Sequence, residues 1–250
     1  ARRFVDLFAG GLSVSLTVDP PSALINDINP HVINLYRWAR VGFDCPDALP
    51  LDAVPLLNER AAYERNRARF NELIAAGRHM TPEAALLFWY LNRTAYNGLC
   101  RFNRKGFFNA PFGSYKRIDY VKLFERVRGY QDRMLNWRFV CRDFAKAPLF
   151  PGDFVYADPP YDSEGGGAFV GYAAGGFSWG DQERLASLLA RHDGPVVVSN
   201  AATPRVVALY EAKGFTIEYV DAPRRISCTG DRTPVREILA TRGTTRGLER

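Results

Sequence analysis

The chain has 250 residues, of which 47% are hydrophobic and 24% are charged, and its net charge is +6. A chain of this size can bury a substantial core in one large domain, or in one domain that carries an insertion. No run approaches 18 consecutive apolar residues and the amino terminus lacks the regions of a signal peptide, so we expect a soluble cytoplasmic protein without a transmembrane helix.

The few cysteines and histidines exclude a recognisable metal or thiol site. They are widely spaced and match neither a zinc pattern nor a catalytic-thiol pattern, so they are interpreted as buried or incidental side chains and no metal is expected. The positive charge and the pI near 9.2 are compatible with a polyanionic partner. The residues concerned are Cys45, Cys100, Cys141, Cys228, His31, His79 and His192.

The first thirty residues have the pattern of a nucleotide-binding βαβ unit. Residues 3–8 predict a buried strand, and Gly10 and Gly11 follow it where a helix is expected to begin. Glycines at such a turn let a ligand approach the backbone near the helix amino terminus. Residues 23–27 predict a second strand that ends in Asp27, 17 residues after Gly10. An acid at about this distance binds ribose hydroxyls in such units.

The regular alternation of strands and helices is then interrupted. A helix is expected over residues 31–40, residues 42–55 contain three prolines, and residues 56–91 have a helical pattern with an arginine-rich surface. Thr81, followed by a proline, is a helix start signal. Alternation resumes only near Leu135, so the simplest interpretation is an inserted lobe of roughly ninety residues.

The segment from residue 93 to residue 117 is basic, aromatic and free of acidic residues. Its cations are Arg93, Arg101, Arg104, Lys105, Lys116 and Arg117. Its aromatic residues are Tyr96, Phe102, Phe107, Phe108, Phe112 and Tyr115. Cations interleaved with aromatic side chains suit phosphate contact and base stacking. The alternative is an ordinary solvated basic surface.

Residues 154–161 (FVYADPPY) predict a buried strand that ends in a rigid polar loop. In open α/β sheets, ligands bind at the carboxyl ends of strands. The carboxylate of Asp158 and the carbonyl of Pro159 could accept the two N–H bonds of an exocyclic amine on a base. Pro160 would stiffen the loop and Tyr161 would stack on the ring. The alternative is that the two prolines only make a turn.

The remaining segments complete an α/β pattern. A glycine-rich loop at residues 164–176 is expected to order over the target base or its strand. The other expected elements are a helix at 181–191, a strand at 195–200, a helix at 203–214, and strands at 215–220 and 236–241.

These motifs resemble the Dam family of DNA adenine-N6 methyltransferases. The resemblance runs from Phe4 to about Ala240, and it is most specific in residues 90–103, 108–113 and 158–161. It implies an α/β fold: a Rossmann-like S-adenosylmethionine-dependent methyltransferase domain with an inserted, mainly helical target-recognition domain that carries a β-hairpin. The domain boundaries expected from the sequence are 1–40 and 131–250 for the catalytic domain and 41–130 for the recognition domain.

The resemblance also implies roles for individual residues. The implied catalytic residues are Asp158, Pro159, Pro160 and Tyr161. The implied cofactor-binding residues are Phe8, Ala9, Gly10 and Gly11 in the cofactor loop, Asp27 at the ribose, Asp143 and Phe144 beside the cofactor adenine, and Asp158. The cofactor would be S-adenosylmethionine, and no metal is required.

The DNA-binding residues follow in the same way. Tyr96 and Asn97 resemble residues that enter the base stack, and Leu99, Arg101 and Pro111 resemble base-reading residues of relatives whose target is GATC. An arginine in the major groove can bond O6 and N7 of guanine, which is worth about 1 to 3 kcal/mol of discrimination. The remaining implied DNA contacts are Asn103 and the phosphate-binding candidates Arg93, Arg104, Lys105 and Lys116.

The expected activity is therefore methylation of a flipped adenine in double-stranded DNA, within GATC or a related short site. Expected partners are duplex DNA and, in a restriction-modification system, a cognate restriction endonuclease. Two alternatives stay open at this point. One is methylation of cytosine N4 or of RNA, against which residues 90–113 argue. The other is a non-catalytic DNA-binding relative, because the family's amino-terminal Trp-x-Gly-Gly-Lys segment is missing from the chain.

Overall fold

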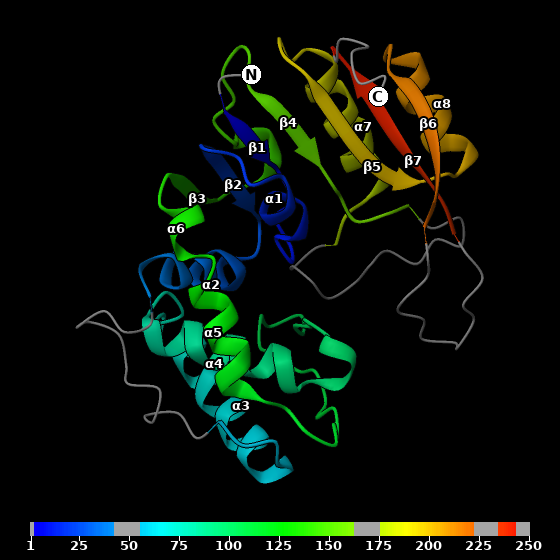
Figure 1. Ribbon diagram of the computed structural model, residues 1–250. Coiled ribbons are helices and arrows are strands. Elements are labelled where there is room, and N and C mark those ends of the chain that lie inside the picture. The colour runs from blue at the N-terminus through cyan, green and yellow to red at the C-terminus, as the bar shows by residue number, and fades with distance from the viewer. Residues whose placement is uncertain (1–2, 43–55, 163–175, 223–234, 244–250) are drawn as a thin grey trace. The chain divides into compact units, whose positions relative to one another are not determined.

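The computed structural model describes residues 3–42, 56–162, 176–222 and 235–243 (Figure 1). The glycine-rich loop expected at residues 164–176 falls almost entirely outside these described residues. The chain divides into two compact units. The first unit comprises residues 1–27, 142–170 and 176–250, and the second comprises residues 28–141 and 171–175. The sequence predicted boundaries near residues 40 and 130, and the roles of the two units stay predictions.

Six consecutive strands of a mixed sheet lie in the first unit, in the order β2-β1-β4-β5-β7-β6. Strands β2, β1, β4 and β5 are parallel, whereas β7 runs antiparallel to β5 and β6. This mostly parallel α/β arrangement is consistent with a Rossmann-like methyltransferase. The strands are β1 (Phe4–Asp6), β2 (Ala23–Asp27), β4 (Phe154–Ala157), β5 (Val196–Ala201), β6 (Thr216–Ala222) and β7 (Val235–Arg242).

The strand order reverses between β1 and β4, and this reversal positions the site. The chain moves from β1 to β2 on one side, whereas β4 pairs with β1 on the other side. Asp6 lies opposite Tyr156 in the β1–β4 register. The segments that follow these two residues therefore emerge side by side at the carboxyl edge of the sheet. In doubly wound α/β folds, this switch point is where ligands bind.

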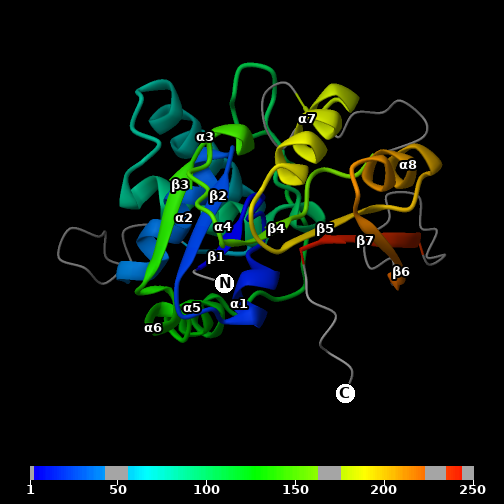
Figure 2. The same cartoon turned by 90° about the horizontal axis from the view of Figure 1, so that it is seen from above.

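Helices cover both faces of this sheet. Figure 2 shows α7 (Trp179–Ala190) and α8 (Pro204–Ala212) on one face and α1 (Ser13–Val18) on the other. Helix α7 begins with a capping box, in which Ser178 and the aspartate at the third helical position bond each other's backbone N–H groups. Thr203 caps α8, as its position before a proline predicts. Val5 of β1, Val155 of β4, and Val196 and Val198 of β5 are fully buried between these layers.

The second unit is mainly helical and has an aromatic core. The rings of Phe70, Phe88 and Phe108 pack within 6.5 Å of one another, and Tyr63 and Tyr90 are fully buried beside them. Its elements are α2 (Pro30–Val41), α3 (Arg60–Ala75), α4 (Pro82–Thr94), the 3-10 turns of η2 (Tyr96–Gly98), α5 (Tyr120–Arg128), α6 (Gln131–Met134) and β3 (Trp137–Cys141).

Two features of the second unit differ from the sequence-based expectation. The sequence analysis predicted no helix between residues 117 and 135, where α5 and α6 lie. The predicted β-hairpin is present only as an isolated antiparallel bridge between Phe102 and Phe108, without regular strands. The reason is that side chains and the turn itself, rather than a long ladder, satisfy this segment's backbone groups.

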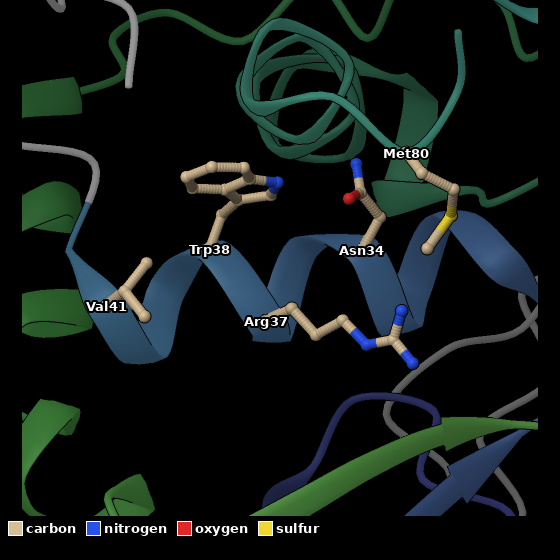
Figure 3. Close-up of a pocket in the computed structure, with 5 residues that line it drawn as sticks. All are labelled: Asn34, Arg37, Trp38, Val41 and Met80. Carbon is tan, nitrogen blue, oxygen red and sulfur yellow. The ribbon is translucent and has the colours of Figure 1, made fainter. Parts of the chain in front are cut away.

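A cavity of about 380 Å³ in the second unit (Figure 3) is lined by Asn34, Arg37, Trp38, Val41 and Met80. Asn34 Nδ2 already donates to the carbonyl oxygens of His79 and Thr81, at 3.1 and 2.9 Å. Arg37 points away from Trp38 and donates to the Phe139 carbonyl at 2.9 Å. Because these polar groups serve the fold, the cavity offers little for ligand recognition. No described helix is both long and apolar enough to cross a lipid bilayer.

Candidate active site

Asp158 lies directly after β4, at the switch point of the sheet. Ala157 pairs with Val198 on β5, so the next residue of each strand emerges at the same edge. There the Ser199 hydroxyl donates to Asp158 Oδ1 at 2.7 Å. The hydroxyl of Tyr156 lies 3.1 Å from Ser199 Oγ, which extends the chain of polar groups into the sheet. The carboxylate therefore has a fixed orientation.

The environment of Asp158 makes its charge costly. Burial of the carboxyl group among its neighbours raises its pKa above the usual aspartate range, and the Ser199 hydrogen bond opposes this only in part. The residue as a whole nevertheless keeps solvent access. A carboxylate that is partly shielded from water but still reachable from the surface is a strong hydrogen-bond acceptor.

Side chains from three elements hold the loop after Asp158. Gln182 Nε2, on α7, donates to the Pro160 carbonyl at 2.9 Å, and Asn200 Nδ2 donates to Gln182 Oε1 at 3.0 Å. Tyr161 donates its hydroxyl to Glu237 Oε2 at 3.0 Å. Both Gln182 and Asn200 are buried. The loop is therefore preorganised by a satisfied polar network.

The glycine turn after β1 contacts the end of β2. The Gly10 N–H donates to Asp27 Oδ2 at 2.9 Å, which joins the two motifs that the sequence analysis paired. Gly10 has a φ of 43° and Leu12 a φ of 61°, so the turn is left-handed at both residues. A Cβ added at Gly11 would meet no atom within 4 Å. The backbone here is open to a close approach by a ligand.

Asp6, at the end of β1, stabilises this turn through hydrogen bonds to residues on either side of it. Its Oδ1 accepts the Phe8 N–H at 3.2 Å, and its Oδ2 accepts the Ser15 hydroxyl at 2.6 Å. Asp6 is only 2% exposed, and burial raises its pKa to about 7 in spite of these bonds, with the charges of Asp158 and Asp27 adding to the effect. The acids at the ends of three strands thus repel one another.

An aromatic cluster lies beside the glycine turn. The ring of Phe8 is 5.6 Å from that of Phe144 and 5.7 Å from that of Phe177, and the last two rings are 5.9 Å apart. Arg184, on α7, bonds both carboxylate oxygens of Asp143 and stacks on Phe144 with its Cζ 4.9 Å from the ring centre. This combination of rings and a fixed acid suits a flat heteroaromatic ligand.

In the second unit, the turn that carries most predicted DNA-binding residues is anchored on α3. Asn71 donates to the Phe108 carbonyl at 3.1 Å and accepts the Phe108 N–H at 2.8 Å. Tyr63 donates its hydroxyl to the Ala110 carbonyl at 2.8 Å. Asn103 Oδ1 accepts two backbone N–H groups and so shapes the turn. These bonds hold the turn in place although no regular strands flank it.

The side chain of Arg101 is exposed, but two hydrogen bonds to Asn109 fix its orientation. Its Nε and Nη2 donate to the side chain and the backbone carbonyl of Asn109, at 3.0 and 2.9 Å. Nη1 and one proton of Nη2 point away from these bonds, so the outer edge of the guanidinium is available to an acceptor pair. Arg101 is therefore presented as a fork rather than as a mobile charge.

The other predicted DNA-binding residues lie mostly at the surface. Tyr96 is 52% exposed, and Asn97 has a left-handed φ of 50° that projects this short turn outward. The Tyr96 N–H donates to the Pro111 carbonyl at 2.8 Å, so two predicted positions are directly joined. Leu99 and Asn103 are half-buried. The exposed members are Arg93, Tyr96, Asn97, Arg101, Arg104, Lys105, Pro111 and Lys116.

The sequence analysis missed the residues that support the site from a distance. Ser199, Gln182 and Glu237 contact the predicted catalytic loop from positions 41, 22 and 76 residues away. Only the position of Ser199 after three valines, near the carboxyl end of a predicted strand, offered a local signal. Within the part of the chain that is described, no group of three or more His, Cys, Asp or Glu side chains could hold a metal ion.

Comparison with known proteins identifies the class. Residues 1–226 match the family described as D12 class N6 adenine-specific DNA methyltransferase, and the chain belongs to this family. Retron Ec67 DNA adenine methylase of Escherichia coli is 37% identical over 249 residues, covering 96% of this chain and 83% of the relative. A DNA adenine methylase of Vibrio cholerae is 34% identical, and the match covers 96% of this chain and 87% of the relative. Type II methyltransferase M1.LlaDCHI of Lactococcus lactis subsp. cremoris is 32% identical, and the match covers 96% of this chain and 86% of the relative.

Proposed function

We propose that this chain transfers a methyl group from S-adenosylmethionine to N6 of an adenine in duplex DNA, within GATC or a related short site. The observation that carries the proposal is the position of Asp158, at the switch point beside the glycine turn and bonded to Ser199 at 2.7 Å. Membership of the adenine-specific family gives the class of base.

Asp158 and Pro159 act on the amine. The lone pair of an exocyclic amine is delocalised into its ring, so the nitrogen is a weak nucleophile until its two N–H groups meet acceptors. The Asp158 carboxylate takes one N–H and the Pro159 carbonyl takes the other. Gln182 holds the next carbonyl in the loop, that of Pro160, so the acceptors keep their spacing without reorganisation during the reaction.

The cofactor fits the first unit. Asp27 is fixed by Gly10 at the end of β2 and suits ribose hydroxyls, and the cluster of Phe8, Phe144 and Phe177 suits an adenine ring. When bound, S-adenosylmethionine would supply an electrophilic methyl group for the amine. The negative charge of Asp158 favours the cationic amine that forms first, this amine then releases one proton to give neutral N6-methyladenine, and no covalent bond to the protein forms.

The second unit supplies recognition in this proposal. Adenine N6 is paired and stacked in a duplex, so the base must be extruded, at a cost of a few kcal/mol. Tyr96, which is exposed, fills the stack, and Tyr161 stacks on the extruded ring. Arg101 reads a guanine through its free edge, while Arg104 and Lys105 bind phosphates. The partner is duplex DNA, and a restriction endonuclease of the same system is a further partner.

One assay tests the proposal. The protein is incubated with labelled S-adenosylmethionine and a mixed-sequence duplex, and the modified bases are mapped at single-base resolution. Asp158→Ala should abolish methyl transfer while cofactor binding, measured by calorimetry, persists. Near-normal turnover by this variant, or label on cytosine N4 or on RNA alone, would overturn the proposal.

A further inference from the structure

A cavity of about 320 Å³ lies in the second unit at the amino end of α5, and its lining is strongly basic. Four of the eight lining residues are cations: Arg93 from the last turn of α4, Arg117 from the connection to α5, and Lys122 and Arg126 from α5 itself. Lys122 and Arg126 are four positions apart on a helix and so share one face. The sequence analysis assigned no function to either residue.

The four cations of this lining outnumber its acid, Asp119. All four side chains belong to exposed residues, and no carboxylate of the described residues forms an ion pair with any of them. Asp119 is the acid in the lining, and its Oδ1 is already used as the cap of α5, accepting the Lys122 N–H at 3.0 Å. Like charges gathered around one cavity repel one another, so a bound anion would relieve the repulsion.

The cavity is built on a rigid base. Tyr120 and Phe124, on the opposite side of α5, are buried against Trp89 of α4, with ring distances of 6.2 and 5.9 Å. The hydroxyls of Thr94 and Tyr120 lie 2.8 Å apart and join the same two helices. The cations therefore project from a fixed helix pair, and binding an anion requires no refolding.

We propose that this cavity binds a backbone phosphate of duplex DNA outside the bases that are read, and that Lys122 and Arg126 are its contacts on α5. This inference rests on the proposed action on DNA. The polar side chains of the lining argue for phosphate rather than for a base. The cations only donate, Asp119 is occupied as a cap, and the Tyr115 hydroxyl donates to the Ala95 carbonyl at 3.1 Å.

The test is a double variant, Lys122→Gln with Arg126→Gln, assayed by fluorescence anisotropy on long labelled duplexes without cofactor. We expect binding about threefold to tenfold weaker at moderate salt, and a slope of log K against log salt that is smaller by about one to two. The loss should be equal for duplexes with and without the target site. The charge-preserving variant Lys122→Arg with Arg126→Lys should retain most of the wild-type affinity.

The matched control is Arg191→Gln with Lys213→Gln, which removes the same charge from exposed positions of the first unit. The proposal falls if this control weakens binding as much, if the α5 variant leaves affinity and salt slope unchanged, or if the loss is confined to the target sequence. Methyl transfer from labelled cofactor is scored separately on the wild-type protein. A failure of the proposed reaction is thus distinguishable from a failure of the phosphate site.

Discussion

The hydroxyl of Ser199, on β5, donates a 2.7 Å hydrogen bond to Oδ1 of Asp158, which follows β4. The same hydroxyl lies 3.1 Å from that of Tyr156. Burial raises the pKa of Asp158, and hydrogen bonding by Ser199, with a smaller contribution from Tyr161, limits the rise. The strand register that brings these two residues together therefore also sets the pH range in which the carboxylate can act.

Ser199→Ala should shift the acidic limb of the activity profile. The ionised carboxylate is the acceptor form, so the rate falls as pH falls through the Asp158 pKa. Removing the donor raises this pKa further, so we expect the midpoint of the limb to move to higher pH. The measurement is kcat against pH. Ser187→Ala on α7 is the control, and an unchanged midpoint in Ser199→Ala would contradict the assignment.

Asn109→Ala should loosen sequence discrimination. The substitution removes the side-chain acceptor of Arg101 Nε and keeps only the backbone carbonyl that accepts from Nη2, so the guanidinium is freer to rotate away from a guanine edge. We expect discrimination against a single-base change to fall about threefold to tenfold, with a smaller effect on affinity for unrelated DNA. Arg104→Gln serves as the comparison, because a phosphate contact should lose affinity on every sequence. Equal losses in the two variants would demote Arg101 to a phosphate contact.

Asp6→Asn should change how stability depends on pH. The Asp6 pKa is about 7 when folded against an ordinary value of 3.8, so below pH 3.8 both states are protonated and there is no penalty. As pH rises to 7, the unfolded state gains by ionising, and the full cost of about 4 kcal/mol is reached above pH 7. The difference in unfolding free energy, variant minus wild type, should rise from pH 4 to 7 and then level off in urea titrations. A pH-independent difference would show that Asp6 ionises normally.

His31→Phe should have the opposite signature. His31 is 7% exposed, stacks on Phe102 at 4.8 Å, and has no hydrogen-bond partner at Nδ1 within the described structure. Burial, together with the neighbouring His79, lowers its pKa from 6.5 to about 4. Its stabilising contribution is therefore complete above pH 6.5 and is lost as pH falls toward 4, by about 3 kcal/mol.

The variant should lose this contribution. In urea titrations, the unfolding free energy of the wild type minus that of His31→Phe should therefore decrease as the pH is lowered from 6.5 to 4. His192→Phe is an unsuitable control because His192 bonds the Asp153 carbonyl at 2.9 Å. His79→Gln is the informative companion, since removing this neighbour, which lowers the His31 pKa, should raise that pKa without abolishing the titration of His31. A stability difference that stays flat across this range would mean that His31 is not buried in its neutral form.

Local sequence determined the elements whose signals are complete within a few residues. Strand β2 spans Ala23–Asp27 as predicted, because a short apolar run is followed by the polar pair Asn26 and Asp27 at its end. Thr81 caps α4 by accepting the Ala84 N–H at 3.3 Å, and the proline after the cap fixes the first turn. The positions of Gly10 and Asp27 likewise predicted their association, because a βαβ unit brings the ends of successive strands together.

Tertiary structure alone decided the hydrogen-bond partners of the loop that begins at Asp158 and the pKa values of the acids around it. The bonds from Ser199, Gln182 and Glu237 depend on strand order and register, which residues 22 to 76 positions apart in the chain do not reveal locally. The raised pKa of Asp6 has the same origin, since desolvation depends on everything packed around a group rather than on its neighbours in sequence. The sequence motifs, through the family that they resemble, therefore determined the expected chemistry. Packing determined the orientation, acidity and support of the groups expected to perform it, because hydrogen bonds and burial act through space.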